Sequence, residues 1–277
     1  MTAPNFGSPT TALCRLLAYA GFTLVLMPLQ LLAVTFGWSL RKSLPFWYHG
    51  CTCRLLGIEI ETLGRPSRHH PTLFAANHVS YLDIEVLGSL LRASFVAKSE
   101  VATWPFFAWL AKLQETVFVE RRVHRAVAHR DEMARRLEAG DDLILFPEGT
   151  SGSGNGILGF KSALFSVAER RPGGKPLTVQ PVSISYTRLD GLPLGRYLRP
   201  LFAWYGDMEL AAHLWHAISL GRVTVVVEFH EPVTIDDFGS RKALSDHCYA
   251  VVARGVAAAL SGRPQPALAP QRAASAA

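Results

Sequence analysis

The run from Leu16 to Leu40 contains no charged residue, and it lies between Arg15 and Arg41. A helix of about 25 residues is roughly 38 Å long, which is enough to cross a hydrocarbon core of about 30 Å. Pro28, near the middle of the run, would kink such a helix or turn it into a hairpin that enters one leaflet. The sequence therefore predicts a membrane anchor, either spanning or held in one leaflet.

Basic residues follow this run at Arg41, Lys42 and Arg54. By the positive-inside rule, we expect the cytoplasmic (inner) membrane as the location, with the rest of the chain on its cytoplasmic side. The composition is 49% hydrophobic and only 18% charged, which favours contact with membrane lipids. The net charge of +6 fits an anionic partner, either a membrane surface or a phosphorylated substrate. No basic run is interleaved with aromatic residues, so we expect no nucleic-acid partner.

The cysteines do not have the spacing of a metal site. Cys51 and Cys53 lie beside His49, but the sequence contains no Cys-x-x-Cys pair and no second cluster of ligands. We therefore expect no metal and thiols that stay reduced.

Short apolar runs alternate with helical periodicity from about residue 46 onward. Helices between consecutive strands are typical of a parallel sheet. The pattern predicts an α/β fold with a mainly parallel central sheet flanked by helices. Strands are expected at Ile58–Thr62, Leu73–Ala76, Ser94–Ala97, Thr116–Val119, Asp142–Phe146, Leu177–Tyr186 and Arg222–Phe229.

Three parts are expected along the chain. Residues 1–45 form a tail and a membrane-anchor helix or hairpin, residues 46–262 form the α/β domain, and the Ala/Pro-rich residues 263–277 form a disordered tail.

Pro181 interrupts the predicted strand Leu177–Tyr186. Because proline cannot donate to a strand ladder, this predicts an edge position or a bulge.

His78 and Asp83 follow the buried run Leu73–Ala76. On one continuous helix, five residues rotate the chain by about 500°, so the two side chains would not share a face. They meet only if His78 lies on a strand-to-helix turn and Asp83 lies one turn into the next helix. A carboxylate on one imidazole nitrogen fixes the tautomer and leaves the other nitrogen to accept a proton. The pair is therefore a candidate general base with its orienting carboxylate.

Two further predicted strands end in polar residues. Arg121 follows Thr116–Val119, and the segment Glu148, Gly149, Thr150, Ser151 follows Asp142–Phe146. In an open α/β sheet, the carboxyl ends of the strands meet in one crevice. Backbone N–H groups in a glycine-rich turn, two hydroxyls and Lys161 downstream suit a phosphate or another anion.

The sequence excludes a nucleotide-binding P-loop and a serine-hydrolase nucleophile elbow. The stretch Gly154–Gly159 has the glycine spacing of a P-loop, but Phe160 stands where lysine is needed. No Gly-x-Ser-x-Gly elbow occurs, so the chain offers a base without an evident nucleophile. We therefore expect the attacking hydroxyl to come from the substrate.

Four blocks of the chain together resemble those of a known family. They are Asn77-His-x4-Asp83, Phe118-Val-Glu-Arg121, Phe146-Pro-Glu-Gly-Thr-Ser151 and Gln180-Pro-Val-Ser183. In order and approximate spacing, they resemble the glycerolipid acyltransferases, and most closely the bacterial 1-acylglycerol-3-phosphate (lysophosphatidic acid) acyltransferases. The resemblance covers about residues 45–235.

The resemblance implies a glycerol-3-phosphate acyltransferase-like fold and a role for each block. His78 would be the general base and Asp83 its partner, while Arg121 and the segment 148–151 would bind the glycerol phosphate. The Pro181 block would support the acyl side. The acyl donor would be acyl-CoA or acyl-carrier protein, used as a co-substrate with no cofactor. The implied product is phosphatidic acid, made from a lysolipid acceptor in the membrane.

Two departures from the family leave alternatives open. Glu115 stands where the second block often has glycine, and Ser151 stands where the third block often ends in arginine. Because the missing arginine is a bidentate phosphate contact, the phosphate acceptor comes into question. Lyso-ornithine lipid is the alternative acceptor. A non-catalytic lipid-binding protein is the alternative of another class.

Overall fold

The computed structural model describes residues 7–98, 107–119 and 126–262. Its strands form one sheet in the order β1-β8-β6-β2-β5-β3-β4, and β7 pairs with β6. All neighbouring pairs are parallel except β6 with β8 and β6 with β7, so the predicted fold class is confirmed. The strands are β1 (Ile58–Gly64), β2 (Thr72–Ala76), β3 (Ser94–Lys98), β4 (Val117–Val119), β5 (Leu143–Leu145), β6 (Thr178–Leu189), β7 (Leu192–Pro193) and β8 (Val223–Phe229).

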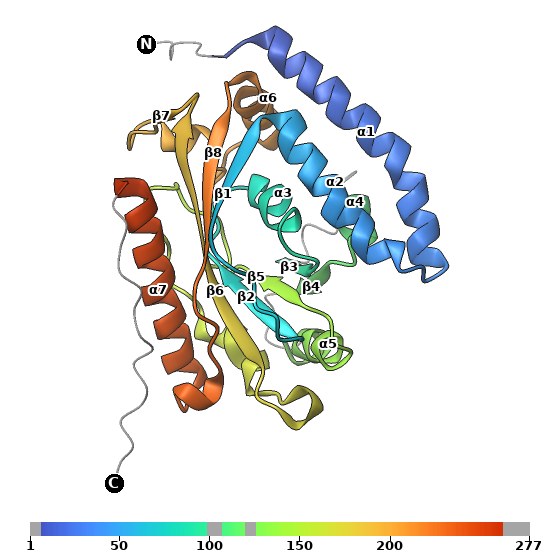
Figure 1. Ribbon diagram of the computed structural model, residues 1–277, viewed down its shortest axis with the longest axis vertical. Coiled ribbons are helices and arrows are strands. Elements are labelled where there is room, and N and C mark those ends of the chain that lie inside the picture. The colour runs from blue at the N-terminus through green and yellow to red at the C-terminus, as the bar shows by residue number, and fades with distance from the viewer. Residues whose placement is uncertain (1–6, 99–106, 120–125, 263–277) are drawn as a thin grey trace.

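Helices cover both faces of this sheet (Figure 1). One face carries α7, together with α5 and the 3-10 helix Ser162–Glu169, and the other carries α1, α2, α3 and α6. The helices are α1 (Pro9–Thr35), α2 (Leu40–Leu56), α3 (Leu82–Gly88), α4 (Phe107–Leu113), α5 (Ala126–Glu138), α6 (Leu210–Ser219) and α7 (Arg241–Ser261). The expected tail, residues 263–277, lies outside the described residues.

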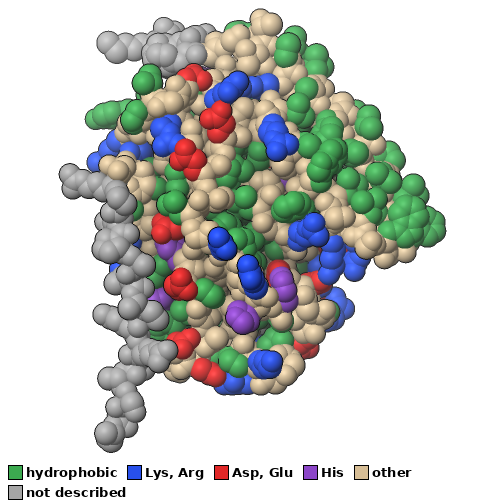
Figure 2. Space-filling view, viewed as in Figure 1, with side chains coloured by type: hydrophobic (Ala, Val, Ile, Leu, Met, Phe, Trp, Pro, Cys, Tyr) green, Lys and Arg blue, Asp and Glu red, His purple; other side chains and the backbone are tan. Residues whose placement is uncertain are grey.

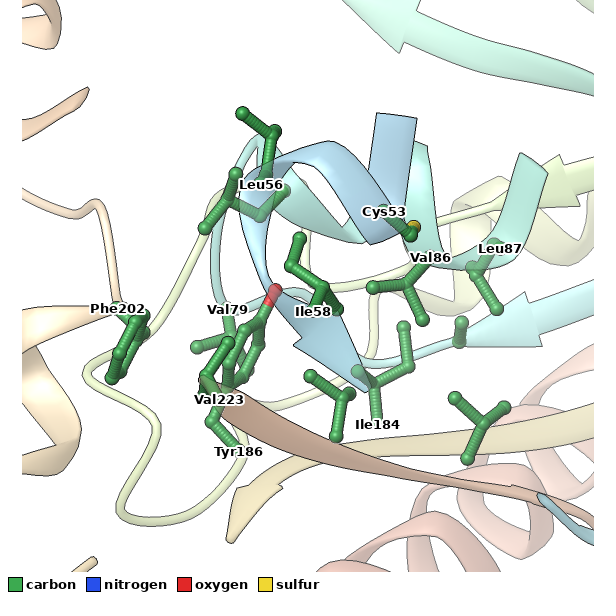
Figure 3. Close-up of a cluster of buried hydrophobic side chains, with 14 of the residues drawn as sticks. Cys53, Leu56, Ile58, Val79, Val86, Leu87, Ile184, Tyr186, Phe202 and Val223 are labelled. Carbon is green, nitrogen blue, oxygen red and sulfur yellow. The ribbon is translucent and has the colours of Figure 1, made fainter. Parts of the chain in front are cut away.

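Each face of the sheet has its own hydrophobic core, because side chains alternate along a strand. In β2, Leu73 packs toward α5 and α7, whereas Phe74 packs toward α2 and α3. Figure 3 shows part of the second core. There, Cys53 of α2 and Val86 of α3 point toward Ile184 of β6. The helices nearest the candidate site, α2 and α3, pack on this core.

Pro181 does not lie on an edge strand, so that prediction is wrong. Strand β6 lies inside the sheet between β8 and β2, and its register shift occurs at Tyr186/Arg188. Pro181 still accepts a hydrogen bond from the backbone N–H of His230 (3.0 Å), but it has no N–H to return. The side-chain amide of Gln180 donates to the carbonyl of His230 instead (2.8 Å). A neighbouring side chain thus replaces the donor that proline lacks.

The uncharged N-terminal run is not one helix. Helix α1 ends at Thr35, and a turn containing Gly37 (φ +66°) leads into α2. The two helices pack as a hairpin, with Thr23 Oγ1 2.8 Å from the Tyr48 hydroxyl. Pro28, at which the sequence analysis left open the turn of a hairpin, lies inside α1 instead. The expected domain boundary after residue 45 falls inside α2.

Helix α1 has a largely apolar outer surface. It is the helix among the described residues that is long and apolar enough to cross a membrane, and only 17% of its most apolar window is buried. Apolar side chains gather over α1 in the space-filling view (Figure 2). Those exposed on the hairpin and its turn are Leu13, Leu17, Leu24, Val25, Leu29, Leu31, Leu32, Phe36, Trp38 and Trp47.

Both halves of α1 are hydrogen-bonded to the rest of the molecule. Near its start, Arg15 Nη1 donates to the carbonyls of Ile218 (3.0 Å) and Leu220 (2.7 Å). Near its end, Gln30 Nε2 donates to the carbonyl of Leu113 in α4 (2.8 Å). The helix therefore lies along the α/β domain and does not project away from it.

Candidate active site

Asn77 fixes the chain where it leaves strand β2. Its side-chain oxygen accepts the backbone N–H of Ile184 (2.8 Å), and its amide nitrogen donates to the carbonyl of the same residue (3.0 Å). The side chain therefore extends the pairing between β2 and β6 by one residue. Because Asn77 is buried, the turn that follows starts from a rigid point.

His78 and Asp83 meet as the sequence predicted. His78 lies on the turn, Asp83 lies in the first turn of α3, and Nδ1 of the imidazole is 2.8 Å from Oδ2 of the carboxylate. With Nδ1 engaged, Nε2 is the nitrogen left to face a ligand. The His78 side chain is 21% exposed, whereas that of Asp83 is fully buried.

Four donors surround the buried carboxylate of Asp83. Besides the imidazole, Oδ2 accepts the backbone N–H groups of Val79 (2.7 Å) and Ser80 (3.0 Å), and Oδ1 accepts the hydroxyl of Tyr186 (2.9 Å). These donors replace the water that burial removes. Burial and the nearby charge of Asp83 raise the pKa of Tyr186, so its phenol stays protonated and keeps donating.

Glu148 ties the loop after β5 to the turn that carries His78. Its Oε1 accepts the backbone N–H of His78 (2.9 Å), and its Oε2 accepts that of Leu158 (2.9 Å). In return, the backbone N–H of Gly152 donates to the carbonyl of His78 (2.9 Å). Burial raises the pKa of Glu148 to about 7, although both N–H donors favour its ionised form. Both oxygens of Glu148 thus bind backbone, and its neighbours Gly149, Thr150 and Ser151 line the cavity described below.

Lys161 lies against the same loop. Gly149 has φ +67°, and a Cβ atom placed on it would lie 2.6 Å from Lys161 Nζ. The hydroxyl of Ser151 donates to the backbone carbonyl of Trp204. The structure therefore brings the predicted residues 148–151 and Lys161 together beside His78. Arg121, the remaining predicted site residue, lies outside the described residues.

A cavity of about 560 Å³ opens beside His78, between the sheet and the α1–α2 hairpin. Its walls are mainly apolar, and Phe146 stacks on the His78 ring with centroids 4.1 Å apart. No lysine or arginine lines it among the described residues, and its one carboxylate, Glu85, lies 2.6 Å from His49 Nδ1. Other lining residues come from the surrounding helices, among them Leu16, Tyr19, Leu26, Met27, Gln30, Leu44, Leu110, Leu113, Leu210, Leu214 and Ile218.

Sequence reasoning missed Tyr186, Gln30 and the His49–Glu85 pair. Tyr186 reaches Asp83 across 103 residues, and Gln30 reaches Leu113 across 83. No local spacing rule connects positions so far apart. Tyr186 does lie in the predicted strand that begins at Leu177, next to the run Leu73–Ala76 in space, but nothing in the sequence set that pairing.

This fold and site match a known class of protein. The model of the acyltransferase family matches residues 57–185, which include His78, Asp83 and the loop after β5. Relatives in the same family are more than 30% identical over most of their length. The chain belongs to the acyltransferase family.

Several relatives carry the name lyso-ornithine lipid O-acyltransferase. The protein from Rhizobium meliloti is 43% identical over 84% of this chain and 81% of its own length. The protein from Brucella abortus is 44% identical over 82% of this chain and 87% of its own. A 1-acyl-sn-glycerol-3-phosphate acyltransferase from Neisseria gonorrhoeae is 34% identical over 69% and 71%.

The fold also matches a solved structure. The 1-acyl-sn-glycerophosphate (LPA) acyltransferase PlsC from Thermotoga maritima superposes with a TM-score of 0.65, covering 92% of this chain and 98% of that one. Sequence identity between the two is 22%, so the comparison supports the architecture and carries no argument about the acceptor.

Proposed function

We propose that this protein transfers a fatty acyl group from acyl-CoA or acyl-carrier protein to the hydroxyl of a lysolipid, with lyso-ornithine lipid as the preferred acceptor. The observation that carries the proposal is the His78–Asp83 pair at the wall of a large, mainly apolar cavity. The general base lies beside a cavity that can hold an acyl chain, and the protein has no evident nucleophile of its own. This arrangement suits attack by a hydroxyl of the substrate.

The proposed reaction needs one base and no covalent enzyme intermediate. His78 Nε2 takes the proton of the acceptor hydroxyl as its oxygen attacks the thioester carbonyl. The resulting oxyanion collapses, the carbon–sulfur bond breaks, and His78 returns the proton to the leaving thiolate. Asp83 holds the Nδ1–H tautomer and stabilises the imidazolium formed between the two proton transfers. General-base assistance of this kind contributes about 10²–10⁴-fold.

The charge of the site favours an acceptor other than a phosphate. A phosphate binds best to arginine forks, but Ser151 stands in place of the family's arginine and its hydroxyl is engaged with Trp204. Among the described residues, Lys161 is the cation next to the loop. One ammonium matches the single carboxylate of an ornithine head, and the relatives named for lyso-ornithine lipid share the higher identity.

Lysophosphatidic acid remains the competing acceptor, favoured by the Neisseria relative. An acceptor panel with one labelled acyl-thioester decides between them. We expect kcat/KM at least tenfold higher for lyso-ornithine lipid than for lysophosphatidic acid. The reverse order would overturn the choice of acceptor, and thiol release without any lysolipid would indicate a thioesterase. Absence of both transfer and thiol release would support a non-catalytic lipid-binding protein.

We further propose that the α1–α2 hairpin attaches the protein to one leaflet of the cytoplasmic membrane, with the α/β domain on the cytoplasmic side. The exposed apolar surface of α1 favours lipid contact. Hydrogen bonds from Arg15 and Gln30 hold both halves of α1 to the domain, which opposes a spanning arrangement. Such a helix binds by inserting its apolar side among lipid chains.

A further inference from the structure

Glu85 is a carboxylate in a cavity whose walls are otherwise mainly apolar. It lies in α3 and lines the cavity, and its side chain is 14% exposed. One oxygen, Oε2, is 2.6 Å from His49 Nδ1 of α2. The other oxygen, Oε1, accepts no hydrogen bond within the described parts of the chain and is not buried. Oε1 is therefore open to a donor that a bound ligand brings.

The two carboxylates of α3 differ in how well they are satisfied. Asp83 is fully buried and has four donors around it, whereas Glu85 has the imidazole of His49 as its donor among the described residues. Two residues along a helix rotate the side chain by about 200°, so Glu85 points away from Asp83 and toward α2. The contact with His49 links α3 to α2 through Oε2, but it leaves the second oxygen without a partner in a mainly apolar setting. A structural role for the pair thus accounts for only one of the two oxygens.

Two tyrosines lie close to the carboxylate of Glu85. Tyr19 of α1 and Tyr48 of α2 both line the cavity, and burial together with the charge of Glu85 raises the pKa of each phenol. The carboxylate therefore faces the space between α1, α2 and α3, which belongs to the cavity. A carboxylate beside aromatic rings suits an ammonium group. No lysine or arginine of the described chain lines the cavity, so such a cation has to come from the ligand.

We propose that Glu85 binds the ammonium of the acceptor's head group and thereby selects a zwitterionic head over a phosphate. The inference rests on the proposed function and names the contact that determines the choice of acceptor. An ornithine head carries one carboxylate and one side-chain ammonium. Lys161, against the cavity-lining Gly149, pairs with the carboxylate, and Glu85 pairs with the ammonium. Lysophosphatidic acid has no cation to offer, and its phosphate is repelled by the charge of Glu85.

The test compares two acceptors that differ in one group. Lyso-ornithine lipid is assayed beside the same lipid built on norleucine, in which a methyl group of similar size replaces the ammonium. The reacting hydroxyl, the head carboxylate, the acyl chain and the acyl-CoA donor are the same in both assays. For the wild-type protein, we expect kcat/KM to be about ten- to hundredfold higher with ornithine, which is the range of one hydrogen bond to a charged group. Equal values for the two heads would overturn the proposal.

Variants then assign this preference to Glu85. In Glu85→Gln, which keeps the shape of the side chain, we expect the ornithine-to-norleucine ratio of kcat/KM to fall at least about fivefold, because a neutral amide holds an ammonium less strongly. Glu231→Gln, which removes the same charge at an exposed residue, keeps the wild-type ratio. Taking a ratio cancels any loss of folded enzyme, and an unchanged ratio in Glu85→Gln would overturn the role of Glu85. Transfer to the norleucine lipid, which needs no ammonium contact, separates failure of this proposal from failure of the acyltransferase function.

Discussion

The hydroxyl of Tyr186 donates a 2.9 Å hydrogen bond to Asp83 Oδ1, joining the middle of the sheet to the carboxylate that holds His78. In Tyr186→Phe this buried oxygen loses its donor, which costs about 1–3 kcal/mol of unfolding free energy. We expect kcat to fall roughly tenfold with little change in KM, because the imidazole is held less firmly. Kinetics and thermal unfolding of the purified protein check both effects. Tyr197→Phe, at a residue 94% exposed, is the control, and equal behaviour of the two variants would contradict the role.

Replacing either member of the His78–Asp83 pair should stop the reaction without removing the fold. We expect His78→Ala and Asp83→Asn each to lower kcat by about 10²–10⁴-fold, the range of general-base assistance. The asparagine can present its N–H to the imidazole and so favour the wrong tautomer. His69→Ala, at an exposed histidine, should keep wild-type rates. Near-normal activity in a well-folded His78→Ala protein would rule His78 out as the base.

Stability should respond to the titration of Glu148. Burial raises its pKa from 4.5 to about 7 in the folded protein. Between these values the folded state holds a proton that the unfolded state has lost, so this carboxyl lowers the unfolding free energy as pH rises. Across the pH range between these two pKa values, the unfolding free energy changes by at most about 3 kcal/mol. Chemical denaturation of wild type and Glu148→Gln at several pH values checks this. The difference between their unfolding free energies should change by this amount from pH 4.5 to 7, and a constant difference would argue against the shift.

Lys161 should act on the acceptor and not on the thioester. Removing its ammonium in Lys161→Ala takes away the cation that lies against Gly149. We expect KM for lyso-ornithine lipid to rise about three- to tenfold while KM for acyl-CoA stays constant, as for loss of one charge-assisted hydrogen bond near the surface. Lys175→Ala, at another exposed lysine, provides the matched control. A rise in KM for the thioester alone would place Lys161 on the donor side.

The two ends of α1 should lie on the same side of the membrane. Cysteines introduced at Thr10 and Ser39 report the two ends of the helix, and both positions are exposed. The background carries Cys14→Ser and Cys51→Ser, because these are the native cysteines that are not buried. In sealed membrane vesicles of known orientation, we expect a membrane-impermeant maleimide to label both from the cytoplasmic face. Labelling from opposite faces would show that the helix spans the bilayer.

Local chemistry was predictable from the sequence, and long-range contacts were not. The meeting of His78 and Asp83 follows from helix geometry over five residues, and the structure has it. The Glu148 loop was placed correctly because parallel strands end at one edge of the sheet. The prediction of an edge strand at Pro181 failed. The interior strand tolerates proline because the Gln180 side-chain amide supplies the missing donor, and the sequence does not show where that amide points. Hydropathy alone could not place the turn at Gly37, since apolar residues continue on both sides of it.

The α1–α2 hairpin forms one wall of the cavity beside His78, and its outer side exposes apolar side chains. If the hairpin lies among lipid tails, as we propose, a lysolipid can enter the cavity sideways from the leaflet without passing through water. The product, which carries one more chain and is less soluble, can return by the same route. Turnover would then depend on how freely lipids diffuse within the bilayer, and a stiffer membrane should slow the enzyme even when its chemistry is unchanged.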